Sequence, residues 1–111
     1  MEWRFARSFS VTVTADDQAI RARFVGDFDA LTAMAFRKQL TIPARRGDHV
    51  ILDLTGLEHL DMTGVREIRR LEGDINSRGA KAHIRGATPE AMQLLDYVAP
   101  AAALTRRSFG D

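Results

Sequence analysis

Apolar and polar residues alternate in two neighbouring stretches near the start of the chain. The first stretch, from Ser8 to Thr14, is rich in β-branched residues. In the second, from Ala19 to Val25, arginines separate the apolar residues Ile20, Ala22 and Phe24. Such alternation is typical of strands with one buried face, and the Ala-Asp-Asp-Gln segment between them favours a turn. We therefore expect a β-hairpin here.

A first helix is expected from Ala30 to about Leu40. The segment from Gly26 to Asp29 breaks the preceding strand, and Asp29 is a good N-terminal cap. Helical spacing places three apolar residues on one face and three more beside it. These residues are Leu31, Met34 and Ala35, with Ala33, Phe36 and Leu40 beside them.

Two further helices are expected later in the chain. One runs from about Thr63 to Ser77, and Gly79 is a typical C-cap glycine after it. Its apolar stripe consists of Val65, Ile68, Leu71 and Ile75. The other starts at Thr88 and Pro89, a cap followed by proline at the first helical position, and Pro100 stops it. Its apolar residues are Ala91, Leu94, Leu95 and Val98.

The remaining apolar stretches are predicted strands. His49 to Leu54 is nearly continuously apolar, as expected of a central strand. Thr55 to Leu60 is expected to be a loop, Lys81 to Ile84 a short strand and Leu104 to Arg107 a last short strand. The order β-β-α-β-α-β-α predicts an α/β fold with a mixed sheet, in which parallel crossovers follow the opening hairpin.

Length and composition mainly exclude classes of structure and function. We expect the 111 residues to form a single domain (residues 1–111), with a core at about residues 9–99 and tails at residues 1–7 and 101–111. The chain has no cysteine, which excludes disulfides and thiolate chemistry. The net charge of +1 gives no sign of nucleic-acid binding. No apolar run is long enough for a membrane span, and the start has no signal-peptide core, so we expect a cytoplasmic protein.

The residues also give little support to catalysis or metal binding. The histidines, His49, His59 and His83, are far apart in the sequence and none has a helical partner of ligand type. We therefore expect no catalytic residue, no cofactor and no metal. Asp16 and Asp17, together with the strand that contains Asp53, resemble a response-regulator receiver, but a second strand follows the acidic pair where a receiver has a helix. The pair is better explained as turn chemistry.

The segment Asp61-Met62-Thr63-Gly64-Val65, at a predicted helix start, is the most informative one. The first-turn N–H groups of a helix point outward, and the helix dipole is positive there. A hydroxyl at this place is exposed to a modifying enzyme, and a phosphate on it is tolerated. The simpler interpretation is that Asp61 or Thr63 only caps the helix.

Three segments, in order, resemble the STAS domain, the fold of bacterial anti-sigma-factor antagonists and of the cytoplasmic ends of sulfate transporters. Gly26-Asp27-Phe28-Asp29-Ala30 resembles the Gly-Glu-Leu-Asp segment after the second strand of that family. Val50 to Leu57 resembles its core strand Val-x-Leu-Asp-Leu-Ser-x-Val, and Asp61 to Val65 resembles its Asp-Ser-Ser/Thr-Gly-Leu helix start. The resemblance covers roughly Val11 to Val98 and implies helices largely on one side of the sheet.

The resemblance implies a partner-switching mechanism. In the antagonists, the first hydroxyl of the Asp-Ser-Ser/Thr-Gly segment is phosphorylated by a kinase that is also the anti-sigma factor, and only the unmodified form binds that kinase. Here Asp61 matches the acid and Thr63 the second hydroxyl, but Met62 stands at the phosphorylated position. Methionine cannot be phosphorylated, so we expect a chain without the standard switch. Alternatively, Thr63 accepts the phosphate, turned by about 100° around the helix.

We expect a partner to bind around this helix start. The expected partner-binding residues are Asp61, Met62, Thr63, Gly64, Arg66, Glu67, Asp27 and Asp29. The charged residues Arg66, Glu67, Arg69 and Arg70 are either a docking surface or a solvated face with local pairs.

The expected partner is a kinase-like anti-sigma factor or, in the alternative, the ATPase of a lipid-transport ABC system that a small STAS subunit braces. Because only eleven residues follow Pro100, we expect the closing helix of the family to be missing or very short. We then expect an apolar patch that is open to a partner or a second copy of the chain.

Overall fold

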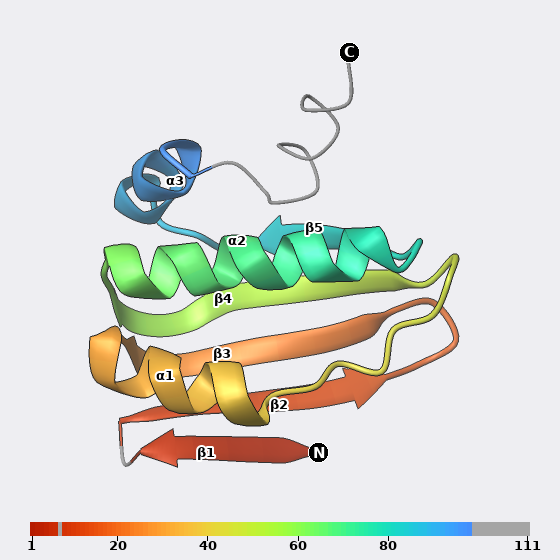
Figure 1. Ribbon diagram of the computed structural model, residues 1–111, viewed down its shortest axis with the longest axis horizontal. Helices are drawn as coiled ribbons and strands as arrows, with labels where there is room; N and C mark the ends of the chain where they lie inside the picture. Colours follow the sequence, from red (N-terminus) through yellow and green to blue (C-terminus); the bar gives the residue numbers. More distant parts are fainter. Residues whose placement is uncertain (7, 99–111) are drawn as a thin grey trace.

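Five strands form one mixed sheet in the order β1-β2-β3-β4-β5 (Figure 1). The computed structural model describes residues 1–6 and 8–98. The elements are β1 (Glu2–Ala6), β2 (Phe9–Ala15), β3 (Ile20–Phe28), α1 (Ala30–Gln39), β4 (His49–Leu60), α2 (Met62–Ser77), β5 (Lys81–Arg85) and α3 (Pro89–Asp96). The pairs β1/β2 and β2/β3 are antiparallel, whereas β3, β4 and β5 are parallel. The expected α/β fold with an opening hairpin and parallel crossovers is confirmed.

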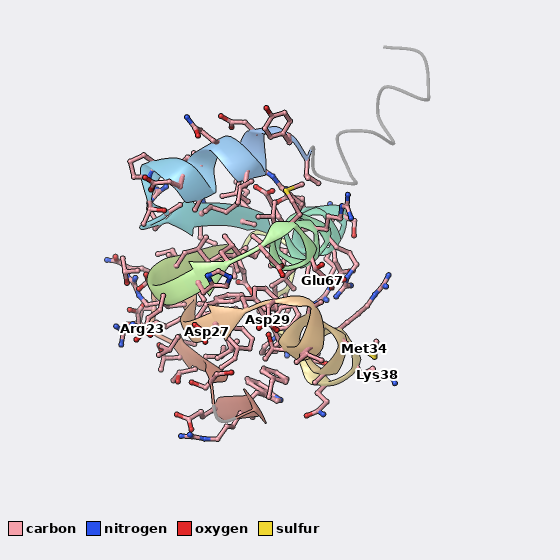
Figure 2. The ribbon with its side chains drawn as sticks, turned by 90° about the vertical axis from the view of Figure 1, so that its left-hand side faces the viewer. Arg23, Asp27, Asp29, Met34, Lys38 and Glu67 are labelled. Carbon is pink, nitrogen blue, oxygen red and sulfur yellow. The ribbon has the colours of Figure 1, made fainter. Side chains whose placement is uncertain are left out.

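The helices α1 and α2 lie side by side on one face of the sheet, and α3 lies at the β5 edge beside α2 (Figures 1 and 2). The apolar stripe predicted for α2 is buried. Below the starts of α1 and α2, four phenylalanines form the centre of the core, and the rings of Phe9 and Phe28 stack at 4.5 Å between centroids. The other two, Phe24 and Phe36, contact both of them.

The N-terminal residues were expected to be a tail, but Glu2–Ala6 forms β1, which pairs with β2 at the sheet edge. Trp3 and Phe5 pack against the core, and the ring of Phe5 lies 5.6 Å from that of Phe9. The stretch has only two apolar residues in alternation, which is too short a pattern to indicate a strand without its partner. The predicted strand at residues 104–107 and the tail at residues 101–111 lie outside the described residues.

The prediction of a loop from Thr55 to Leu60 is also wrong, because β4 continues through this segment to Leu60. The strand β3 is longer than expected as well and ends at Phe28, and the two strands stay paired to their ends through two register shifts. Gly26 stands at the second shift with a φ of +100°, which glycine adopts without strain. A Cβ on it would also lie 1.8 Å from the carbonyl oxygen of Ser8, just before β2. The register shifts break the simple alternation from which a strand is predicted.

The prediction that Leu31 and Met34 lie on the buried face of α1 is wrong. The side chain of Leu31 is 86% exposed and that of Met34 is 65% exposed. Instead, α1 buries Thr32, Ala33 and Phe36. The Thr32 hydroxyl accepts a hydrogen bond from the backbone N–H of Asp29 (3.0 Å) and donates one to the Asp27 carbonyl oxygen (3.1 Å). This capping box directs Thr32 inward and so fixes the rotation of the helix.

Candidate functional site

The starts of α1 and α2 lie at the same end of the sheet. The last residues of the parallel strands β3 and β4, Phe28 and Leu60, are register partners, and the caps Asp29 and Asp61 follow them directly. The backbone N–H of Asp61 donates to the Phe28 carbonyl oxygen at 3.3 Å. Ligand sites of α/β proteins are usually found at such carboxyl ends of parallel strands.

Asp61 caps α2, as the simpler interpretation of the segment requires. Its Oδ1 accepts a hydrogen bond from the Gly64 N–H at 3.0 Å, and its carbonyl accepts one from the Val65 N–H at 3.0 Å. Gly64 is needed for close packing, because a Cβ on it would lie 2.5 Å from the carbonyl oxygen of Phe28. The aspartate and the glycine of the segment therefore both have structural roles that keep α2 against the end of β3.

Met62 and Thr63 are the first two residues of α2, which begins one residue earlier than predicted. Met62 is half-buried, whereas Thr63 is exposed. Among the described residues, the Thr63 hydroxyl has no hydrogen-bond partner, so capping does not use it. The helix start thus presents one partly apolar and one hydroxyl side chain on adjacent faces.

The two aspartates before α1 are not on the same side of the sheet. Asp29 accepts hydrogen bonds from the N–H groups of Leu31 and Thr32, at 3.0 and 3.2 Å, and so belongs with the helix starts. Asp27 lines a cleft of about 380 Å³ together with Arg4 and with Glu58. Figure 2 shows Asp27 nearer to the uncovered face of the sheet and Asp29 nearer to α1. Asp61, Met62, Thr63, Gly64 and Asp29 are therefore together, and Asp27 lies apart from them.

Most charges on the first half of α2 are held in ion pairs. Glu67 pairs with Arg70 on its own helix at 2.8 Å and with Arg37 of α1 at 3.8 Å. Arg69 pairs with Glu72 at 2.6 Å. Arg66 is exposed and forms no ion pair within residues 1–6 and 8–98. Arg66 is thus the charge at this helix start most available to a partner.

A second cleft, which the sequence did not indicate, lies between the end of β4 and α3. Its volume is about 310 Å³. The residues that line it are Leu54, Leu57, Glu58, His59, Leu60, Ala87, Thr88, Glu90, Ala91 and Leu94. Leu57 and Leu60 belong to the segment that was expected to be a loop, and they form a wall of the cleft because β4 extends through it.

Two of the three histidines meet in space, although they are far apart in the sequence. The parallel pairing of β4 and β5 brings His49 Nδ1 to 3.0 Å from His83 Nε2. The pKa of His83 is lowered, first by burial and then by the neighbouring His49, Arg85 and Lys81. His59 lies at the opposite end of β4. No group of three or more metal-ligating side chains occurs in the described part of the chain.

The aspartates of the receiver-like interpretation have structural roles. Asp16 closes the hairpin turn by accepting from the N–H groups of Gln18 and Ala19, at 2.8 and 2.9 Å. Asp53 lies within β4, where it accepts from the Thr55 hydroxyl at 2.6 Å and from Arg21 at 3.4 Å. Burial raises the pKa of Asp53, but these hydrogen bonds and charges outweigh it, so that the pKa lies below the usual range.

No curated protein matches the chain. Within the described residues, no helix has both the length and the apolar character that a membrane span requires. The STAS domain family matches residues 10–99, which run from within β2 to beyond α3 and contain the starts of both α1 and α2. The chain therefore belongs to the STAS domain family.

Proposed function

We propose that this STAS domain is a non-catalytic protein-interaction module in a partner-switching signalling pathway, in the manner of an anti-sigma-factor antagonist. The observation that carries the proposal is Met62, at the first helical position of α2. It stands beside the Asp61 cap, where the antagonists carry their phosphorylated hydroxyl. The module binds its partner around this helix start without being switched there.

The chemistry of the helix start supports a binding role. Met62 is uncharged, flexible and half-buried, so it gives a partner an adaptable apolar contact. Thr63 and Arg66 beside it are exposed and can donate hydrogen bonds. A phosphate on the first helical residue would add about two negative charges next to Asp61. A chain with methionine there stays in the state that corresponds to the unmodified antagonist.

Thr63 carries the one hydroxyl of the segment Asp61–Val65 that a kinase could phosphorylate. It is exposed, and a phosphate on it would lie near the N–H groups of the first turn. However, it points about 100° away from Met62 around the helix axis. A kinase that recognises the first position would have to bind α2 in another orientation.

A second candidate function rests on the same methionine. A STAS subunit that braces the ATPase of a lipid-transport ABC system has no need of a phosphorylated residue. The two functions predict different partners: a kinase-like anti-sigma factor that acts in the cytoplasm, or a transport ATPase.

The experiment is affinity capture from the lysate of the host, with the captured proteins identified by mass spectrometry. Wild type is compared with Met62→Glu, which places a negative charge at the proposed contact. Thr14→Glu, which adds the same charge at an exposed position of β2, is the matched control. We expect wild type and Thr14→Glu to capture one ATP-binding protein that Met62→Glu loses. Equal capture by all three proteins would overturn the proposal, and the class of ATPase decides between the two functions.

A further inference from the structure

We propose that the cleft between the end of β4 and α3, the β4–α3 cleft, binds an apolar side chain of a partner protein that is flanked by lysine or arginine. This inference rests on the proposed function, because it names the chemistry of the segment that the partner presents next to Met62. The β4–α3 cleft begins at Leu60, directly before the Asp61 cap, so one partner can contact both.

Six of the ten residues that line the β4–α3 cleft are apolar. Leu54 is buried at its base, and Leu57, Leu60 and Leu94 are partly buried around it. The volume of about 310 Å³ is at the lower end of the range for binding pockets. It has room for one bulky side chain, such as a leucine, phenylalanine or tryptophan. Burial of such an anchor in a pocket is the usual source of affinity at an interface.

The walls of the β4–α3 cleft are held in place by the fold. On one side, β4 remains paired with β3 up to Leu60. On the other side, the Arg69 guanidinium of α2 donates two hydrogen bonds to the Leu95 carbonyl oxygen of α3, at 3.1 and 2.9 Å. Thr88 caps the start of α3 by accepting from the Ala91 N–H at 3.1 Å. A pocket with such fixed walls needs little reorganisation on binding.

The rim of the β4–α3 cleft is acidic. Glu58 and Glu90 are both exposed and line it from opposite elements. Asp61 follows β4 at the same end of the sheet. His59 is the only basic residue among those that line the cleft. An apolar wall with carboxylates at its rim is complementary to an apolar residue with cationic neighbours.

Blocked tripeptides test this chemistry without knowledge of the partner. The probe is acetyl-Lys-Phe-Lys-amide, titrated into ¹⁵N-labelled full-length protein at low salt. Acetyl-Lys-Gly-Lys-amide lacks the anchor, and acetyl-Glu-Phe-Glu-amide reverses the flanking charge. We expect only the first peptide to shift the amide resonances of Leu57, Ala91 and Leu94, with a dissociation constant of about 1 mM, which corresponds to a few kcal/mol.

Charge variants test the role of the rim. Glu58→Gln combined with Glu90→Gln should weaken binding of the lysine-flanked peptide roughly threefold or more and reduce its salt dependence. Glu2→Gln combined with Asp17→Asn removes the same charge from exposed positions outside the β4–α3 cleft and should leave binding unchanged. Equal binding of all three peptides, or an equal effect of both double variants, would overturn the proposal.

A second copy of the chain offers related chemistry, since the exposed Met34 lies near Lys38 on α1 (Figure 2). Arg37 adds a second cation in the last turn of the same helix. Sedimentation velocity at increasing concentration distinguishes this occupant. Self-association that Met34→Glu abolishes would assign the β4–α3 cleft to a second copy and overturn the proposal of a partner protein. The peptide titration does not depend on Met62, so its failure would leave the capture experiment and the proposed function standing.

Discussion

The helices α1 and α2 start side by side on the same face of the sheet, and each begins after an aspartate cap. In α2, the apolar residues predicted from spacing are the ones that are buried. In α1, the two residues that opened the predicted face, Leu31 and Met34, are exposed. In the sixteen residues of α2, the apolar stripe keeps helical spacing from Val65 to Ile75. In contrast, α1 has ten residues and a capping box that directs Thr32 inward. Local hydrogen bonding thus decides the orientation of a short helix more strongly than its hydrophobic pattern does.

The largest expected difference between the two helices is in how much the truncation of an apolar side chain lowers the free energy of unfolding. Ile68→Ala in α2 removes a fully buried side chain and should lower the free energy of unfolding by about 2–5 kcal/mol. Leu31→Ala and Met34→Ala in α1 should change it by less than about 0.5 kcal/mol. Urea denaturation measures all three. A loss of more than about 1 kcal/mol at Met34 would mean that α1 is oriented as its sequence pattern predicts.

Close packing at the start of α2 should be sensitive to a single methyl group. Gly64→Ala places a Cβ about 2.5 Å from the Phe28 carbonyl oxygen and should destabilise the protein by about 1–3 kcal/mol. Thr63→Ala, one residue earlier and exposed, serves as the control and should be nearly neutral. If both variants unfold at the same urea concentration, α2 does not lie as close to β3 as described.

The capping box of α1 should account for the buried position of Thr32. Thr32→Val keeps the shape of the side chain but removes the hydroxyl that bonds to Asp29 and Asp27. We expect a loss of about 1–2 kcal/mol in the free energy of unfolding. Thr63→Val in α2 should cost far less, because the Thr63 hydroxyl is exposed. An unchanged stability of Thr32→Val would show that the box does not determine the rotation of α1.

Asp53 offers a contrast to the half-buried helix caps Asp29 and Asp61, since its carboxylate is buried in β4. Its pKa is lower in the folded protein than the ordinary value of 3.8. The ionised carboxylate therefore contributes stability that is fully present above about pH 3.8 and is lost as the pH falls through the lower, folded-state pKa. Unfolding followed between pH 7 and pH 2 should show a smaller acid-induced loss for Asp53→Asn than for wild type. Equal slopes for the two proteins would contradict this role.

The smallest predicted effect compares matched positions of the two helices. Leu31 and Thr63 are each the second residue of their helix, and both are exposed. A glutamate at either position interacts favourably with the helix dipole, so Leu31→Glu and Thr63→Glu should each gain about 0.3–1 kcal/mol at low salt. Thermal unfolding at low and high salt detects the gain and its screening. A loss of stability at Leu31 alone would indicate that this side chain is buried.

The sequence was sufficient to predict the elements that depend on local pattern. The hairpin, the aspartate caps, the stripe of α2 and the order of strands and helices from β2 to α3 all follow from residues close together in the chain, whereas β1 was missed. The features that it missed depend on pairing between distant segments. The extension of β4 to Leu60 depends on register shifts opposite β3, and the contact of His49 with His83 depends on the parallel pairing of β4 and β5.

In the candidate site, too, some features follow from local sequence and others depend on the pairing of distant segments. Asp61 and Gly64 could be recognised from the segment itself, and their geometry explains why an acid and a glycine stand there. The separation of Asp27 from Asp29 could not be predicted, because it depends on the register shift near Gly26. The β4–α3 cleft likewise depends on how α3 docks beside the end of β4, which Arg69 fixes from another helix.

Intact-protein mass spectrometry can show whether the start of α2 binds its partner without being switched at Met62. The chain is incubated with ATP and its captured partner, beside Met62→Ser and Thr63→Ala. If the partner is a kinase-like anti-sigma factor, we expect an unchanged mass for wild type and the addition of one phosphate to Met62→Ser. A phosphate on wild type that Thr63→Ala abolishes would show the opposite, because the switch would then operate one residue further along α2.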